Sequence, residues 1–222
     1  MLTSLSTEVL NSWFDANTSL ILLCALWLLY FCIHSLLANN HVKSRLLTWS
    51  LLSEHFYRLF YNSIALVTLV PILIVIMRYQ GPSVFQWQGL WYFLALVLNL
   101  TALTCFFWSL KYYDMKVFWG WKTSVACSSF VLSPLHRFVR HPWYSCALII
   151  LWCRDLNAAQ LLSSLLVSVY LVVGSRLEEA RLVDEFGRSY EKYMERVPSL
   201  IPLPWKFLKK SQRDELISKD YI

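Results

Sequence analysis

The sequence predicts an all-α integral membrane protein, and its composition and aromatic content carry this prediction. Hydrophobic residues make up 57% of the 222 residues and charged residues only 15%, which is too apolar for an ordinary soluble domain. The 11 tryptophans and 12 tyrosines suit the two membrane–water interfaces, because their rings are amphipathic. We therefore expect a lipid bilayer around the protein.

About five apolar segments are expected to form transmembrane helices within a single membrane domain covering residues 1–222. The N-terminus lacks the features of a signal peptide, so the first segment is expected to remain as an anchor. The fourth segment is only about 18 Å long if helical, against about 30 Å of hydrocarbon, and forms a short hairpin with the fifth. The segments cover residues 18–38, 59–77, 89–110, 142–153 and 157–175.

An amphipathic helix is expected over residues 177–197, after the last apolar segment. Its apolar side chains recur every three or four residues, and Gly187 weakens it by up to about 1 kcal/mol relative to alanine. Pro198 ends it, and a basic tail covers residues 203–222. The mixture of charged and aromatic residues between 111 and 140 predicts a segment lying in the headgroup layer.

The distribution of positive charge predicts the orientation. With five crossings, every Lys and Arg except Arg78 and Arg154 falls on the side opposite the N-terminus, and cytoplasmic loops are enriched in these residues. The N-terminus is therefore expected outside and the C-terminus in the cytoplasm. The net charge of +6 is spread over several short loops, so nucleic-acid binding is not expected.

Metal binding and disulfides are not expected either. The six cysteines lie mostly inside apolar runs and form no C-x-x-C pair. We interpret them as small apolar side chains that fill the packing between helices.

Polar residues flank the hairpin on one predicted face. Arg140 and His141 precede the fourth segment, and Glu178 and Glu179 follow the fifth, so the hairpin brings them together near the cytoplasm. Charges beside lipid are costly and often functional. Arginine grips carboxylates bidentately, and Pro142 suits the first turn of a helix.

Structural alternatives remain for each of these groups. Arg140 and His141 also fit as ordinary basic flanks of a membrane helix, and the two carboxylates as partners of Arg176 or Arg181. Since neighbouring helical residues point about 100° apart, one carboxylate of the pair can face the core while the other lies beside it.

Two further residues are candidates outside this cluster. His34 lies late in the first segment, and an intramembrane ionisable group suggests a site, although a hydrogen-bonded interface histidine explains it equally well. Tyr190, in the amphipathic helix, has a packing role or a role in the site.

Several short motifs together resemble the isoprenylcysteine carboxyl methyltransferase and phospholipid methyltransferase superfamily. They are Arg140-His141-Pro142-Trp143-Tyr144, Leu177-Glu178-Glu179, Phe186-Gly187-x-x-Tyr190-x-x-Tyr193 and Val197-Pro198-x-Leu200-Ile201-Pro202. The N-terminal half, with His34-Ser35-Leu36-Leu37-Ala38, is similar to NnrU-type membrane proteins and bacterial methanethiol S-methyltransferases.

The resemblance implies an S-adenosylmethionine-dependent membrane methyltransferase, with a thiol preferred among small or lipophilic acceptors entering from the membrane. It implies that Glu178 binds the cofactor, together with His141, Pro142, Tyr144, Glu179 and Tyr190. It also implies a bacterial inner membrane. The sequence departs from the family at Cys146, where glycine is usual.

Catalytic roles are expected for three residues. Arg140 would orient an anionic acceptor, and His34 or Glu178 would take a proton from a thiol or amine. Methyl transfer itself depends chiefly on positioning the reactants and excluding water.

Two other functions stay open at this point. NnrU-type proteins also resemble haem-containing carotene isomerases, in which His34 and His141 would ligate iron. A non-catalytic membrane accessory protein is the other alternative, and Cys146 is the feature that supports it.

Overall fold

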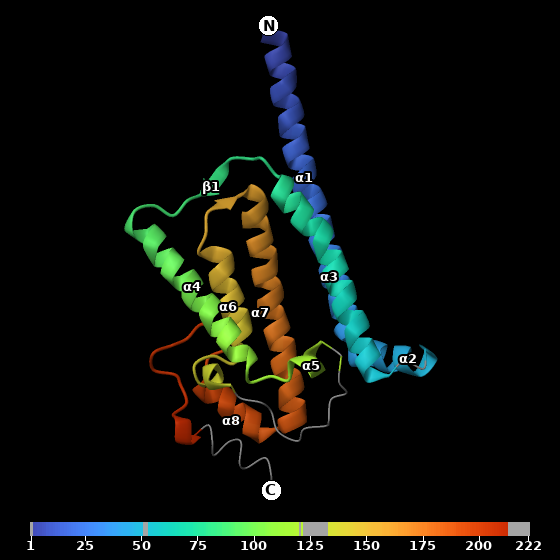
Figure 1. Ribbon diagram of the computed structural model, residues 1–222, viewed down its shortest axis with the longest axis vertical. Helices are drawn as coiled ribbons and strands as arrows, with labels where there is room; N and C mark the ends of the chain where they lie inside the picture. Colours follow the sequence, from blue (N-terminus) through green and yellow to red (C-terminus); the bar gives the residue numbers. More distant parts are fainter. Residues whose placement is uncertain (1, 51–52, 120, 122–132, 213–222) are drawn as a thin grey trace. The chain divides into compact units, whose positions relative to one another are not determined.

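The computed structural model describes residues 2–50, 53–119, 121 and 133–212, and helices dominate it (Figure 1). Within these ranges, four helices are long and apolar enough to cross a membrane, and a fifth apolar helix is shorter. The all-α membrane fold expected from the sequence is therefore confirmed. The four candidate spans are Ala16–Ala38, Phe56–Arg78, Leu90–Leu110 and Ala158–Phe186, and the shorter helix is Pro142–Trp152.

The chain divides into two compact units. Unit 1 contains α1 (Leu2–Ala38), α2 (Asn40–Ser50), α3 (Glu54–Arg78) and two short strands. Unit 2 contains α4 (Leu90–Leu110), α5 (Met115–Phe118), the 3-10 helix η1 (Pro134–Arg137), α6 (Pro142–Trp152) and α8 (Arg188–Arg196). Helix α7 (Ala158–Phe186) contributes its residues through Val167 to unit 1 and the remainder to unit 2.

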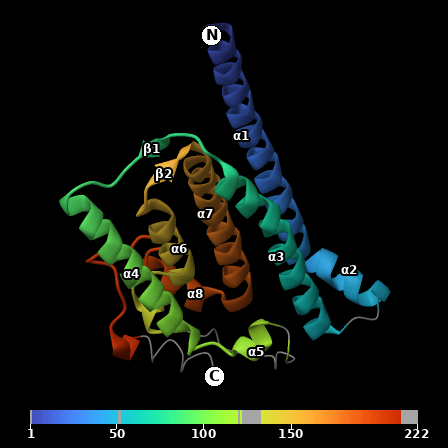
Figure 2. The same ribbon diagram turned by 45° about the horizontal axis from the view of Figure 1, so that its top comes forward.

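Unit 1 is built on the pairing of α1 with α3. Leu23, Ile72 and Ala159 are fully buried in its core, and the Trp27 indole donates a 3.0 Å hydrogen bond to Ser163 Oγ. The strands β1 (Ser83–Phe85) and β2 (Leu156–Asn157) pair antiparallel (Figure 2). Sequence periodicity did not indicate this pair, because each strand is too short to show alternation.

Unit 2 is built around the short helix α6, which packs along α4. The Trp143 indole, in the first turn of α6, donates a 2.7 Å hydrogen bond to Ser109 Oγ near the end of α4. At the other end of α6, the Asn99 amide donates to the Cys153 carbonyl, and the Trp152 indole donates to Ser168 Oγ of α7 at 2.9 Å. Side chains of α4 and α7 therefore fix both ends of α6.

The expected helix over residues 177–197 is wrong in its boundaries. Helix α7 continues through Glu178 and Glu179 to Phe186, and a separate helix, α8, begins at Arg188. Gly187 separates them with a φ of 55°, a left-handed conformation that glycine adopts at little cost. The residue that weakened the sequence pattern is thus where the chain turns.

Candidate functional site

The site begins where the chain enters α6. Pro142 is buried and is the first residue of this helix. An N–H group in the first turn has no partner within the helix, so proline loses nothing there by lacking one. The preceding residues are held by the chain that follows α8. Arg140 N–H donates to Pro198 O at 2.9 Å, and His141 N–H donates to Ser199 O at 3.1 Å. Residues 58 positions apart are therefore joined by backbone hydrogen bonds.

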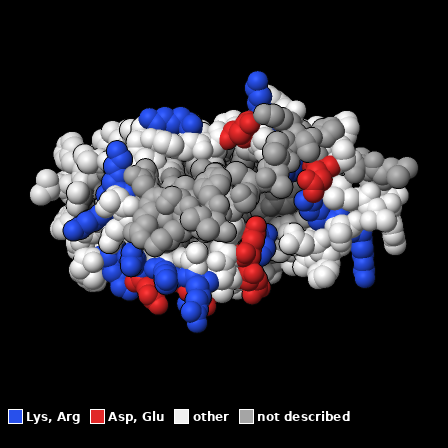
Figure 3. All heavy atoms as spheres, turned by 90° about the horizontal axis from the view of Figure 1, so that it is seen from below, with Lys and Arg blue, Asp and Glu red and all other residues white. Residues whose placement is uncertain are grey.

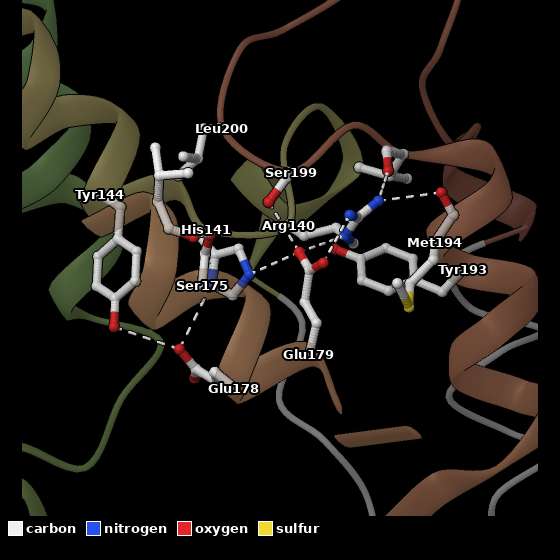
Figure 4. A network of polar contacts seen from close by, with 12 residues as sticks. Arg140, His141, Tyr144, Ser175, Glu178, Glu179, Tyr193, Met194, Ser199 and Leu200 are labelled. Carbon is white, nitrogen blue, oxygen red and sulfur yellow. Dashed lines mark hydrogen bonds and ion pairs between the residues drawn. The ribbon is translucent and has the colours of Figure 1, made fainter. Parts of the chain in front are cut away.

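The Arg140 guanidinium lies in the middle of the polar cluster (Figure 4). Nε donates to Glu179 Oε1 at 2.8 Å and Nη2 donates to Glu179 Oε2 at 2.9 Å, the bidentate geometry that favours arginine over lysine. Nη1 donates to the carbonyls of Met194, at 3.0 Å, and Val197. Arg140 thus ties α7 to the C-terminal end of α8.

Glu179 is the acceptor shared by this cluster. Besides Arg140, its Oε1 accepts from His141 Nε2 at 2.9 Å and from Ser199 Oγ at 2.8 Å. Only 8% of its side chain and 10% of that of Arg140 are exposed. Burying a carboxylate is costly unless several donors surround it, and here three side chains provide them.

Glu178 is placed differently from its neighbour. Its side chain is 37% exposed, and its Oε2 lies 3.5 Å from His141 Nδ1. The Tyr144 hydroxyl donates to the same oxygen at 3.3 Å, and the rings of His141 and Tyr144 stack with centroids 5.3 Å apart. His141 therefore lies between a buried carboxylate and a partly open one, as Figure 4 shows.

A partly buried histidine, His136, lies in η1 just before this cluster. His136 Nδ1 accepts hydrogen bonds from the backbone N–H of Ser133 at 3.1 Å and the hydroxyl of Ser133 at 2.8 Å. Burial, with a smaller contribution from the charge of His141, lowers the pKa of His136 to about 4. The Tyr193 hydroxyl donates to the His136 carbonyl at 2.7 Å. The imidazole is therefore neutral at pH 7.

Tyr190, expected at the site, packs in the hydrophobic cluster between α8 and the chain that follows it. It is buried with Tyr193, Val197 and Leu208, and its ring centroid lies 5.6 Å from that of Tyr193. Burial raises the pKa of Tyr190, and the charge of Glu179 adds to this effect. The packing role of Tyr190 is thus observed, and its role in the site stays a prediction.

His34 lies in unit 1, and the other expected site residues lie in unit 2. Its Nε2 is 2.6 Å from the Tyr61 hydroxyl, and its ring stacks on Tyr30 with centroids 5.5 Å apart. The structure therefore brings together Arg140 and the residues around it, and places His34 in a separate aromatic group between α1 and α3. Those collected in unit 2 are Arg140, His141, Pro142, Tyr144, Glu178, Glu179 and Tyr190.

Sequence reasoning missed Ser199 and His136. Ser199 stands at the unspecified position of the Val197-Pro198-x-Leu200 motif, so the motif marked the segment but not the hydroxyl. His136 lies in a stretch interpreted as part of a headgroup segment, and no pattern distinguished it from a basic flank. Cys146, at the family's glycine position, is buried in α6, so the packing of this helix accommodates its side chain.

Comparisons with known proteins found relatives that are methanethiol S-methyltransferases. Methanethiol S-methyltransferase from Pseudomonas sp. is 37% identical over 85 residues, covering 37% of this chain and 33% of that protein. Methanethiol S-methyltransferase 1 from Bradyrhizobium diazoefficiens is 41% identical over 69 residues, covering 31% of this chain and 24% of that protein. The chain thus matches a third or less of these relatives' length.

A third relative, methanethiol S-methyltransferase from Pseudomonas deceptionensis, is 35% identical over 75 residues, covering 33% of this chain and 29% of that protein. No solved structure matches the chain. The family described as NnrU protein matches residues 20–199. Because this match covers most of the sequence, the chain belongs to the NnrU protein family.

Proposed function

We propose that the protein is an S-adenosylmethionine-dependent membrane methyltransferase whose acceptor is a small or lipophilic thiol. The observation that carries this proposal is the partly exposed Glu178 carboxylate, which contacts Tyr144 and His141. His141 also bonds to the buried Glu179, which pairs with Arg140. The partial similarity to methanethiol S-methyltransferases supports the reaction class and the thiol.

The carboxylate of Glu178 and the rings of Tyr144 and His141 suit a cationic ligand. An accessible carboxylate attracts positive charge, and the faces of neighbouring aromatic rings favour it further. When bound, S-adenosylmethionine supplies a methyl group on a positively charged sulfur, together with an ammonium group. In this proposal Glu178 and Tyr144 contact its cationic part, and His141 lines the pocket. Three further residues of the predicted cofactor site support this pocket: Glu179, Pro142 and Tyr190.

Arg140 has a positioning role in this proposal. We expected it to orient an acceptor, but four of its guanidinium hydrogen bonds go to Glu179 and to two backbone carbonyls. It would therefore fix His141 and α7 while the reactants are held together and water is excluded. Glu178 or, as the alternative, His34 remains the proposed proton acceptor for the thiol.

We also propose that the N-terminus is outside and the site faces the cytoplasm of a bacterial inner membrane. The distribution of Lys and Arg supports this orientation, and the bacterial relatives support the membrane. Figure 3 views the protein from the side of α8 and shows charged side chains of both signs there. A C-terminal fusion to a reporter that is active only in the cytoplasm tests the orientation.

The decisive experiment measures cofactor binding before activity. Purified protein in detergent is titrated with S-adenosylmethionine by calorimetry, and then incubated with methanethiol-like and longer-chain thiols while methylated product is measured. We expect saturable binding and a methyl thioether. Absence of binding at millimolar cofactor would contradict the proposal and favour an accessory protein.

A further inference from the structure

An exposed apolar loop follows the polar cluster. We call residues 201–207 the C-terminal loop. Ile201 is 71% exposed and Trp205 is 73% exposed, and the exposed rings of Phe207 and Phe138 stack 6.3 Å apart. Several large apolar side chains exposed on one short segment are a feature of interaction surfaces.

The loop is held at both ends, so its exposed side chains project from an ordered segment. Before it, Ser145 Oγ donates to Leu200 O at 2.6 Å. After it, Leu208 N–H donates to Arg137 O at 2.9 Å, and Arg137 Nε donates to Leu208 O at 2.8 Å. Because Ser145 belongs to the first turn of α6, the loop starts beside the N-terminal end of this apolar helix.

The backbone of the loop suits a poorly hydrated environment. Pro202 and Pro204 have no N–H group, and Lys206 N–H donates to Leu203 O at 3.0 Å. Fewer backbone donors therefore need water than in an ordinary loop, which lowers the cost of moving the backbone out of bulk solvent.

Positive charge accompanies these apolar side chains. Lys206 and Lys209 are exposed on either side of Phe207 and the buried Leu208. A second aromatic and basic group lies at the end of α4, where Lys111 Nζ is 4.8 Å from the centroid of the Trp108 ring. Ser109 beside it bonds to Trp143 in the first turn of α6, so both groups adjoin the same end of this helix. Tryptophan with lysine is typical of the membrane–water interface.

We propose that the C-terminal loop inserts Ile201, Trp205 and Phe207 into the interface of the surrounding bilayer and binds anionic phospholipid headgroups through Lys206 and Lys209. The apolar side chains supply insertion, and the two ammonium groups complement the phosphates. Insertion would hold the segment that carries Ser199 against Glu179, which gives the site a dependence on lipid.

Hydrogen–deuterium exchange of the full-length protein in lipid nanodiscs tests this proposal without any cofactor. The probe is phosphatidylglycerol, present in one preparation and replaced by phosphatidylcholine in the other. We expect the amides of Ile201, Leu203 and residues 205–208 to exchange at least threefold more slowly with phosphatidylglycerol at low salt. The K206Q/K209Q variant should lose this difference, and W205S should exchange faster in both lipids.

The matched control is K116Q/K192Q, which removes the same charge from exposed positions on α5 and α8 and should behave as the wild type. Equal exchange of the wild-type loop in the two lipids would overturn headgroup binding. Slower exchange that instead depends on protein concentration would overturn it in favour of a protein partner. None of these results depends on methyl transfer, so they separate this proposal from the proposed function.

Discussion

Two adjacent carboxylates of α7 occupy opposite environments. Glu179 points into the protein and accepts hydrogen bonds from Arg140, His141 and Ser199, whereas Glu178 is partly exposed and contacts His141 and Tyr144 (Figure 4). The buried side builds a rigid support and the open side presents a charge. The comparison shows how one dipeptide can provide both structure and a binding group.

Breaking the buried side should have the largest effect. Arg140→Met leaves Glu179 buried without its bidentate partner, so we expect the free energy of unfolding in detergent to fall by about 3–5 kcal/mol. A denaturant titration followed by circular dichroism measures this change. Arg181→Met, on an exposed part of the same helix, is the control and should unfold like the wild type.

Acid should have the next largest effect, through His136 in the segment before Arg140. The pKa of His136 is about 4 in the folded protein, against 6.5 ordinarily. Between these pH values the unfolded chain binds more protons than the folded protein. The contribution of His136 to the free energy of unfolding is therefore fully present above about pH 6.5 and is lost as the pH drops towards 4. The loss amounts to up to about 3 kcal/mol.

Unfolding measured at pH 7, 5.5 and 4.5 checks this dependence. His136→Gln keeps an acceptor for Ser133 but has no titrating group, and its stability should therefore vary less over this range. His41→Gln, an exposed substitution, should retain the wild-type slope. An equal slope in all three proteins would contradict the role of His136.

Removing one donor to Glu179 should have a smaller effect. Ser199→Ala deletes a single hydrogen bond to a charged group, which is worth roughly 1.5 kcal/mol, while Arg140 and His141 remain. Thermal unfolding compares Ser199→Ala with Ser199→Thr, which keeps the hydroxyl. Equal loss in both variants would indicate a packing effect rather than a lost hydrogen bond.

Changing the open side should affect binding and leave stability nearly unchanged. Glu178→Gln removes an accessible charge, so we expect the unfolding free energy to stay within about 0.5 kcal/mol. S-adenosylmethionine affinity should fall at least tenfold, which corresponds to about 1.4 kcal/mol. Calorimetric titration measures it, with Glu191→Gln on α8 as the control. Unchanged affinity would remove Glu178 from the proposed site.

Much of the fold was predictable because membrane helices depend on local composition. Long apolar runs identify α1, α3, α4 and α7, and the shortness of the segment beginning at Pro142 was visible from its length alone. The division between α7 and α8 was not, because the charged turn containing Glu178 and Glu179 remains compatible with a helix and only the backbone shows that Gly187 ends it.

The sequence by itself determined that Arg140, His141, Glu178 and Glu179 would meet, since a hairpin of two apolar segments returns the chain to the same face. Only the tertiary structure decided that Glu179 is the buried carboxylate and Glu178 the accessible one. That distinction depends on donors from distant segments, above all Ser199 and the backbone around α8. Burial is a property of the packed neighbours and not of the dipeptide.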